Sequence, residues 1–74
     1  MENQHRQIKG YRELSQGEID WINTIKETGI DLSELVAALN EHMETDKRWV
    51  SIGRTHLQEG LMALTRSVAK PTYF

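Results

Sequence analysis

Lys26, Arg54 and Arg66 each lack a carboxylate partner at helical spacing. Lys26 and Arg54 have only apolar or neutral residues three and four positions away, and Arg66 has only neutral residues and a lysine there. Side chains three or four residues apart lie on one helix face, where opposite charges stabilise each other. Each of these cations is therefore expected either to pair with another chain or to bind an anion.

An aromatic residue precedes these cations, in the stretch HRQIKGYREL. Tyr11 follows Gly10, which gives the backbone freedom to turn. An aromatic ring can stack on a nucleobase while a nearby cation binds its phosphate. A nucleotide site is one interpretation; a basic arm without a ligand and ordinary interface salt bridges explain the same residues.

Composition limits the possible classes of function. Residues 13–46 carry nine acids and one base, whereas residues 47–74 carry five bases and one acid, and the net charge is −2. This balance argues against a DNA- or RNA-binding protein and is typical of an acidic helix beside a basic one. A chain of 74 residues without cysteine buries little core and has no disulfides, so we expect one small domain that oligomerises.

The sequence contains no recognised catalytic or metal-binding motif. His5, His42 and His56 are far apart, none lies in a known metal-ligand pattern, and there is no glycine-rich phosphate loop. No apolar run approaches the roughly 20 residues of a membrane span, and no signal-peptide pattern is present. We expect a soluble cytoplasmic protein that is not an enzyme, with no catalytic residues, metal, cofactor or membrane contact.

Two long helices must position these residues. Ser15 and Glu18 have the spacing of a capping box, which predicts an N-terminal arm over 1–14 and a helix over 16–44. The apolar face of this helix follows a heptad pattern, in which Lys26 lies at the rim. Gly29 occupies one heptad position; glycine is a poor helix former, so it indicates a kink or a close approach. The heptad residues are Ile22, Ile25, Gly29, Leu32, Val36, Leu39 and Met43.

Asp46 is the expected cap of a second helix over 47–69, which must end before Pro71 and leave a tail over 70–74. The short connection predicts an all-α antiparallel hairpin. Two helices cannot enclose a core, so the wide apolar face again indicates an oligomer. Its apolar residues are Val50, Leu57, Leu61, Leu64 and Val68, beside small residues at Gly53, Gly60, Ala63 and Ser67 that predict tight helix packing.

Two segments resemble a known family. The first segment is GYREL with its following IK, and the second contains RW, IGRT, LQ, MAL and VA before Pro71. The sequence resembles the phage-encoded anti-CBASS cyclic-nucleotide sponges, whose helical-hairpin domain also occurs in anti-Thoeris sponges. The resemblance runs from His5 to Pro71. It implies a homohexamer, in the cytoplasm of an infected bacterium, that sequesters cyclic dinucleotides and in some members cyclic trinucleotides. Sequestration without cleavage would keep the effectors of CBASS immunity inactive.

The resemblance also implies roles for individual residues. Tyr11, carried by Gly10, would stack on a base, and Lys26 would contact a phosphate, in a dinucleotide pocket between protomers. Thr28 and Arg66 are candidates for a second, trinucleotide site. Two further residues, Arg54 and Thr55, are either ligand contacts or interface residues.

Two other functions are compatible with parts of the sequence. A coiled-coil adaptor or antitoxin-like interaction module would need the heptads but not Tyr11. A small nucleic-acid binder would use the basic arm, but the acidic first helix argues against it.

Overall fold

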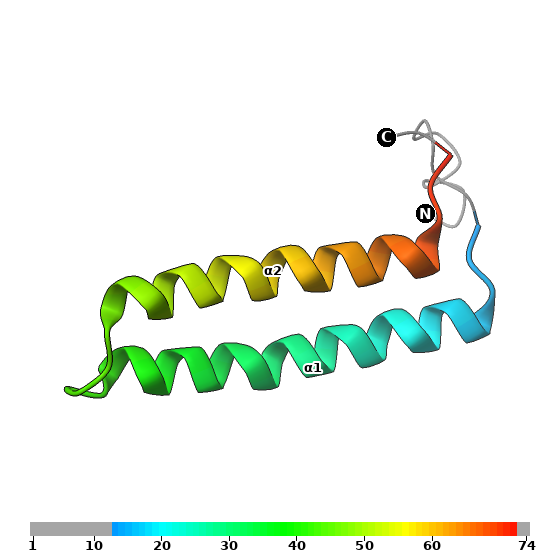
Figure 1. Ribbon diagram of the computed structural model, residues 1–74. Helices are drawn as coiled ribbons and strands as arrows, with labels where there is room; N and C mark the ends of the chain where they lie inside the picture. The colour runs from blue at the N-terminus through cyan, green and yellow to red at the C-terminus, as the bar shows by residue number, and fades with distance from the viewer. Residues whose placement is uncertain (1–12, 73–74) are drawn as a thin grey trace.

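The computed structural model describes residues 13–72, which form two antiparallel α-helices joined by a short turn (Figure 1). Helix α1 spans Gln16–Glu41 and helix α2 spans Lys47–Ala69. No strand occurs in the described part of the chain. The predicted all-α hairpin is therefore confirmed, and α2 occupies the range expected from the sequence.

A capping box begins α1, as its sequence predicts. The Glu18 amide donates to the Ser15 hydroxyl at 3.2 Å, and the Ser15 amide donates to the Glu18 carboxylate at 2.8 Å. These two bonds satisfy amides that have no partner inside the helix. The start of α1 is thus fixed by two side chains three residues apart.

The first helix ends three residues earlier than the predicted residue 44. His42 is extended, with φ −73° and ψ 130°, so the helix stops at Glu41. The Thr45 hydroxyl and the Lys47 ammonium group donate to the His42 carbonyl. Because the turn satisfies a carbonyl at the helix end, continuing the helix gains little.

Helix α2 has a cap at each end. The Asp46 carboxylate accepts from the amides of Arg48 and Trp49, at 3.0 and 3.3 Å. At the other end Lys70 is left-handed, with φ 45° and ψ 60°, and its amide donates to the Arg66 carbonyl at 2.8 Å. Pro71 follows and cannot continue the helix.

The seam between the helices uses most of the predicted apolar residues. On α1 the heptad residues from Ile22 to Val36 are half-buried, but Leu39 and Met43 are 41% and 95% exposed. On α2 the predicted Leu57 and Leu64 are 37% and 55% exposed, and Thr65 is half-buried. The Thr65 hydroxyl donates to the Leu61 carbonyl, which satisfies it within the helix.

Glycines differ in how they contribute to packing. Helix α1 continues through Gly29, where an added Cβ would lie 3.3 Å from Leu61 Cδ1. Gly29 therefore marks a close approach of the helices. At Gly53 and Gly60 an added Cβ would meet nothing within 4 Å. The prediction that these two glycines allow tight packing is wrong for the hairpin itself, because each faces open space.

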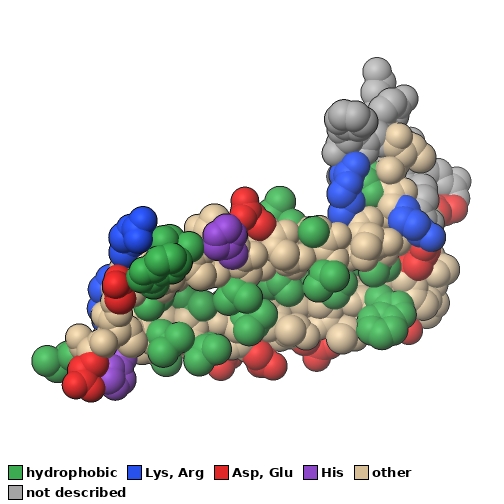
Figure 2. Space-filling view, viewed as in Figure 1, with side chains coloured by type: hydrophobic (Ala, Val, Ile, Leu, Met, Phe, Trp, Pro, Cys, Tyr) green, Lys and Arg blue, Asp and Glu red, His purple; other side chains and the backbone are tan. Residues whose placement is uncertain are grey.

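No described residue is fully buried in the single chain. Apolar side chains lie along the face between the helices, and acidic side chains lie at the outer edge of α1 (Figure 2). Neither helix within residues 13–72 is apolar enough over its length to cross a membrane. The exposed large apolar residues are Ile19, Trp21, Ile30, Leu35, Leu39, Met43, Trp49, Leu57, Met62 and Leu64.

Candidate functional site

Two grooves lie along the hairpin, and both include Gly29 and Leu61 in their walls. The first, the Lys26 groove, has a volume of about 640 Å³. It takes residues from both helices and from the segment after α2. Its lining residues are Ile25, Lys26, Gly29, Glu59, Leu61, Met62, Ala63, Thr65, Arg66, Ala69 and Pro71.

The Lys26 groove brings together two of the cations that the sequence singles out. Lys26 comes from α1 and Arg66 from α2, and both side chains are exposed. Within residues 13–72 the Lys26 ammonium group makes no hydrogen bond or ion pair. The floor between them is apolar. Two cations over an apolar floor suit an anion that also carries a flat or apolar part.

A single carboxylate lines the same groove. Glu59, Met62 and Arg66 are spaced three and four residues apart, so they lie on one face of α2. The Glu59 carboxylate lies 3.4 Å from His56 Nδ1, and both side chains are largely exposed. An exposed pair of this kind is weak and can be replaced by another partner.

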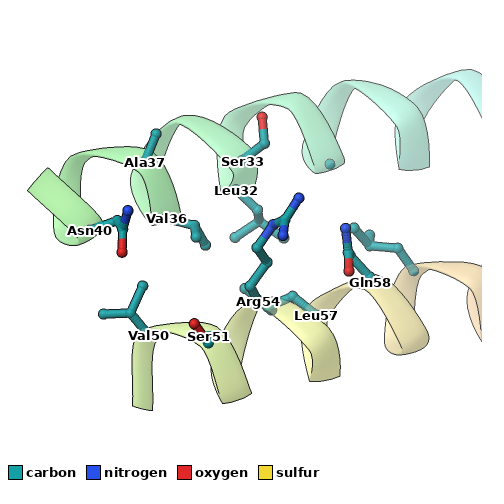
Figure 3. A pocket seen from close by; sticks show the side chains of 12 residues that line it. Leu32, Ser33, Val36, Ala37, Asn40, Val50, Ser51, Arg54, Leu57 and Gln58 are labelled. Atoms are coloured by element: carbon teal, nitrogen blue, oxygen red, sulfur yellow. The ribbon is translucent and has the colours of Figure 1, made fainter. Parts of the chain in front are cut away.

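The second groove, the Arg54 groove, has a volume of about 410 Å³ and lies towards the turn. Arg54 and Gln58 project from α2 towards α1, and Arg54 lies beside Leu32 (Figure 3). Within the described residues Arg54 forms no hydrogen bond or ion pair through its side chain. The groove also contains Ser33, Ala37, Asn40, Val50, Ser51 and Leu57.

The remaining predicted site residues lie elsewhere. The Thr28 hydroxyl donates to the Thr24 carbonyl at 2.9 Å, and the Thr55 hydroxyl donates to the Ser51 carbonyl at 3.2 Å. Neither threonine lines either groove, so a single chain does not bring Thr28 together with Arg66. Gly10 and Tyr11 lie outside the described residues.

Sequence reasoning missed Glu59 and Met62. Both lie on the α2 face that carries Arg66, at spacings of seven and four residues. Extending the helical spacing back from Arg66 would have found them. The same reasoning treated the histidines as isolated and overlooked the contact of His56 with Glu59.

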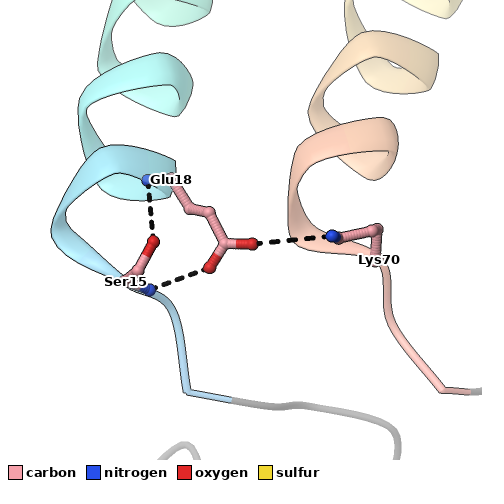
Figure 4. A network of polar contacts seen from close by, with 3 residues as sticks. All are labelled: Ser15, Glu18 and Lys70. Carbon is pink, nitrogen blue, oxygen red and sulfur yellow. Dashed lines mark hydrogen bonds and ion pairs between the residues drawn. The ribbon is translucent and has the colours of Figure 1, made fainter.

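An ion pair joins the two helices beside the Lys26 groove. Lys70 Nζ lies 4.0 Å from Glu18 Oε2, while the same carboxylate completes the capping box with Ser15 (Figure 4). Lys70 precedes Pro71, which lines the groove. Glu18 thus connects the start of α1 with the segment that forms one end of the groove.

The described residues contain no cluster of three side chains that could hold a metal ion. Residues 3–69 match the Acb2/Tad1 hairpin domain. The chain belongs to this family.

A curated relative is similar to this chain over almost its whole length. Anti-CBASS protein 2 of Pseudomonas phage JBD67 is 34% identical to this chain over 105 aligned positions. The alignment covers 96% of this chain and 97% of the relative. The family resemblance predicted from the sequence motifs is confirmed.

Proposed function

We propose that this protein binds cyclic oligonucleotide second messengers without cleaving them, and so blocks CBASS immunity in a bacterium infected by a phage. Its family and its relative, which is named an anti-CBASS protein, support this role. The observation that carries the proposal is the convergence of Lys26 and Arg66 on one groove with an apolar floor.

The Lys26 groove has the size and chemistry for such a ligand. Its volume of about 640 Å³ falls in the range of small-molecule sites, roughly 300–1,000 Å³. A cyclic dinucleotide carries two phosphates and two flat bases. Lys26 and Arg66 would bind phosphate, and Met62 with the other apolar residues would contact a base.

The active form is proposed to be a homo-oligomer, with the hexamer of the resembling sponges as the expected size. No described residue is buried in a single chain, and ten large apolar residues are exposed. A second copy that covers this surface would supply the missing core. Open space at Gly53 and Gly60 would let a partner helix approach closely.

The N-terminal arm is proposed to complete the site. Tyr11, with the backbone freedom of Gly10, would stack on a base of a ligand held by Lys26. Thr28 would contribute to a second, trinucleotide site formed by more than one chain. The resemblance also places Arg66 at that site, whereas within one chain Arg66 lines the Lys26 groove. Arg54 and Thr55 would be contacts or interface residues.

Calorimetry with a panel of cyclic di- and trinucleotides tests the proposal. Tight binding is expected for at least one ligand, and heat denaturation of the complex should release that ligand intact. Degraded nucleotide would show an enzyme, and no binding anywhere in the panel would contradict a sponge. In the second case the exposed apolar face of the hairpin would favour a protein-interaction adaptor.

A further inference from the structure

Glu59 is an unexpected residue in a groove that is proposed to bind phosphate. It is the only acid after Asp46 in the sequence, and it lines the same groove as Lys26 and Arg66. A carboxylate repels phosphate, so at this place it weakens any ligand that presents only anionic groups. Beside a bound ligand, it suits a part that donates hydrogen bonds.

The register of the helices separates Glu59 from the cations along the groove. Gly29 lies against Leu61, so in this antiparallel pair Lys26, three residues before Gly29, lies near the level of residue 64. Glu59 is therefore about 7 Å from Lys26 along the helix axis, at 1.5 Å per residue. This offset is comparable with the span between a nucleotide phosphate and the edge of its base.

An ionised carboxylate only accepts hydrogen bonds, which determines the base that it fits. Guanine presents two adjacent donors on its Watson–Crick edge, N1–H and the N2 amino group, and both can bind one carboxylate. Adenine presents one amino group. Uracil presents one N–H between two carbonyl oxygens, which repel a carboxylate.

We propose that Glu59 is a specificity-determining residue that selects guanine in the ligand of the Lys26 groove, an inference that rests on the proposed function. With Lys26 and Arg66 on phosphate, the carboxylate binds N1–H and N2–H of the base at the other end of the groove. His56 is its exposed partner in the free protein and is displaced by the base. The preference is guanine over adenine over uracil.

Calorimetry with three 3′,3′-linked probes, cyclic di-GMP, cyclic di-AMP and cyclic di-UMP, tests this assignment. Wild type should bind cyclic di-GMP about tenfold or more tighter than cyclic di-UMP, because hydrogen bonds to charged groups are strong. Glu59→Gln should weaken cyclic di-GMP about tenfold. The affinity for cyclic di-UMP should stay unchanged or increase, because the substitution removes a negative charge near the phosphates. If Glu59 had only a structural role, the substitution would change the affinities for both ligands in the same direction.

Glu34→Gln is the matched control, since Glu34 is an exposed acid on α1 that lines neither groove. It should leave all three affinities unchanged, and Glu59→Gln should keep the assembly mass of wild type. Equal affinities for the three probes, a uniform effect of Glu59→Gln or a changed assembly would overturn guanine selection and leave nucleotide binding intact. Wild type that binds no cyclic nucleotide would overturn both proposals.

Discussion

Lys26 is the residue whose loss should cost the most affinity. It has no hydrogen-bond or ion-pair partner in the described chain, so replacing it breaks no internal polar interaction. We expect Lys26→Ala to weaken the best cyclic dinucleotide about 10- to 100-fold, the value of one charge-assisted hydrogen bond of about 1.5–3 kcal/mol. Titration calorimetry at fixed salt measures the effect.

Arg48→Ala is the control for that measurement. Arg48 is also an exposed cation, but it lies at the turn, 5.5 Å from the ring centroid of Trp49, and lines neither groove. The affinity of Arg48→Ala for the same cyclic dinucleotide should stay within about twofold of wild type. Equal losses in Arg48→Ala and Lys26→Ala would mean that only overall charge matters, which contradicts a site at Lys26.

The sequence predicted the chemistry of single residues better than their grouping. The absence of a carboxylate near Lys26 and Arg54 is local information, and both remain unpaired in the described chain. That Lys26 and Arg66 share one groove depends on how the helices are aligned across the seam. This alignment follows from the contact of Gly29 with Leu61, which no spacing within one helix reveals.

At the scale of the helices, Gly29 combines two opposing effects. Alanine in a helix interior is about 1 kcal/mol better than glycine. The new Cβ would lie 3.3 Å from Leu61 Cδ1, but that methyl group borders both grooves and can move. We expect Gly29→Ala to raise the free energy of unfolding by up to about 1 kcal/mol, and Gly29→Leu to lower it, in urea denaturation followed by circular dichroism. A destabilised Gly29→Ala would show that Leu61 is held rigidly.

The left-handed end of α2 gives a second test of an element. A non-glycine residue in this conformation costs roughly 1 kcal/mol, and Lys70 bears that cost. Its ion pair with Glu18 is long, at 4.0 Å, and 68% of the Lys70 side chain is exposed, so the pair contributes little. Lys70→Gly should therefore raise the thermal midpoint, whereas Lys70→Ala should leave it unchanged or slightly lower it. A midpoint lowered equally by both variants would show that the ion pair outweighs the strain.

Helix boundaries were predictable where a side chain caps the backbone. Ser15 and Asp46 are recognisable caps, and the starts of both helices follow from them. The end of α1 was not predictable, because the bonds that satisfy the carbonyl of its C-cap residue, His42, come from Thr45 and Lys47, beyond the helix. Local spacing does not reveal a turn that folds back onto the preceding helix.

For the whole molecule, the central fact is that a single hairpin lacks a buried residue among those described. Heptads predicted a wide apolar face but could not say how much of it one hairpin covers. The structure gives that measure, since ten large apolar side chains remain exposed among residues 13–72. Stability of the free hairpin must then be marginal, because hydrophobic burial is the main favourable contribution to folding.

Stability should therefore depend on protein concentration. If folded protomers are stabilised by association, tenfold dilution must lower the thermal midpoint, as mass action requires.

Leu64→Glu should lower the midpoint and the assembly mass, because Leu64 is a 55% exposed leucine on α2 beside the seam. Met43→Glu is the control, since Met43 is 95% exposed at the turn and lies outside the apolar face. Calorimetric scans and light scattering on the same samples measure both quantities. A midpoint independent of concentration would mean that the hairpin folds alone, and the large exposed apolar face would then need a different partner.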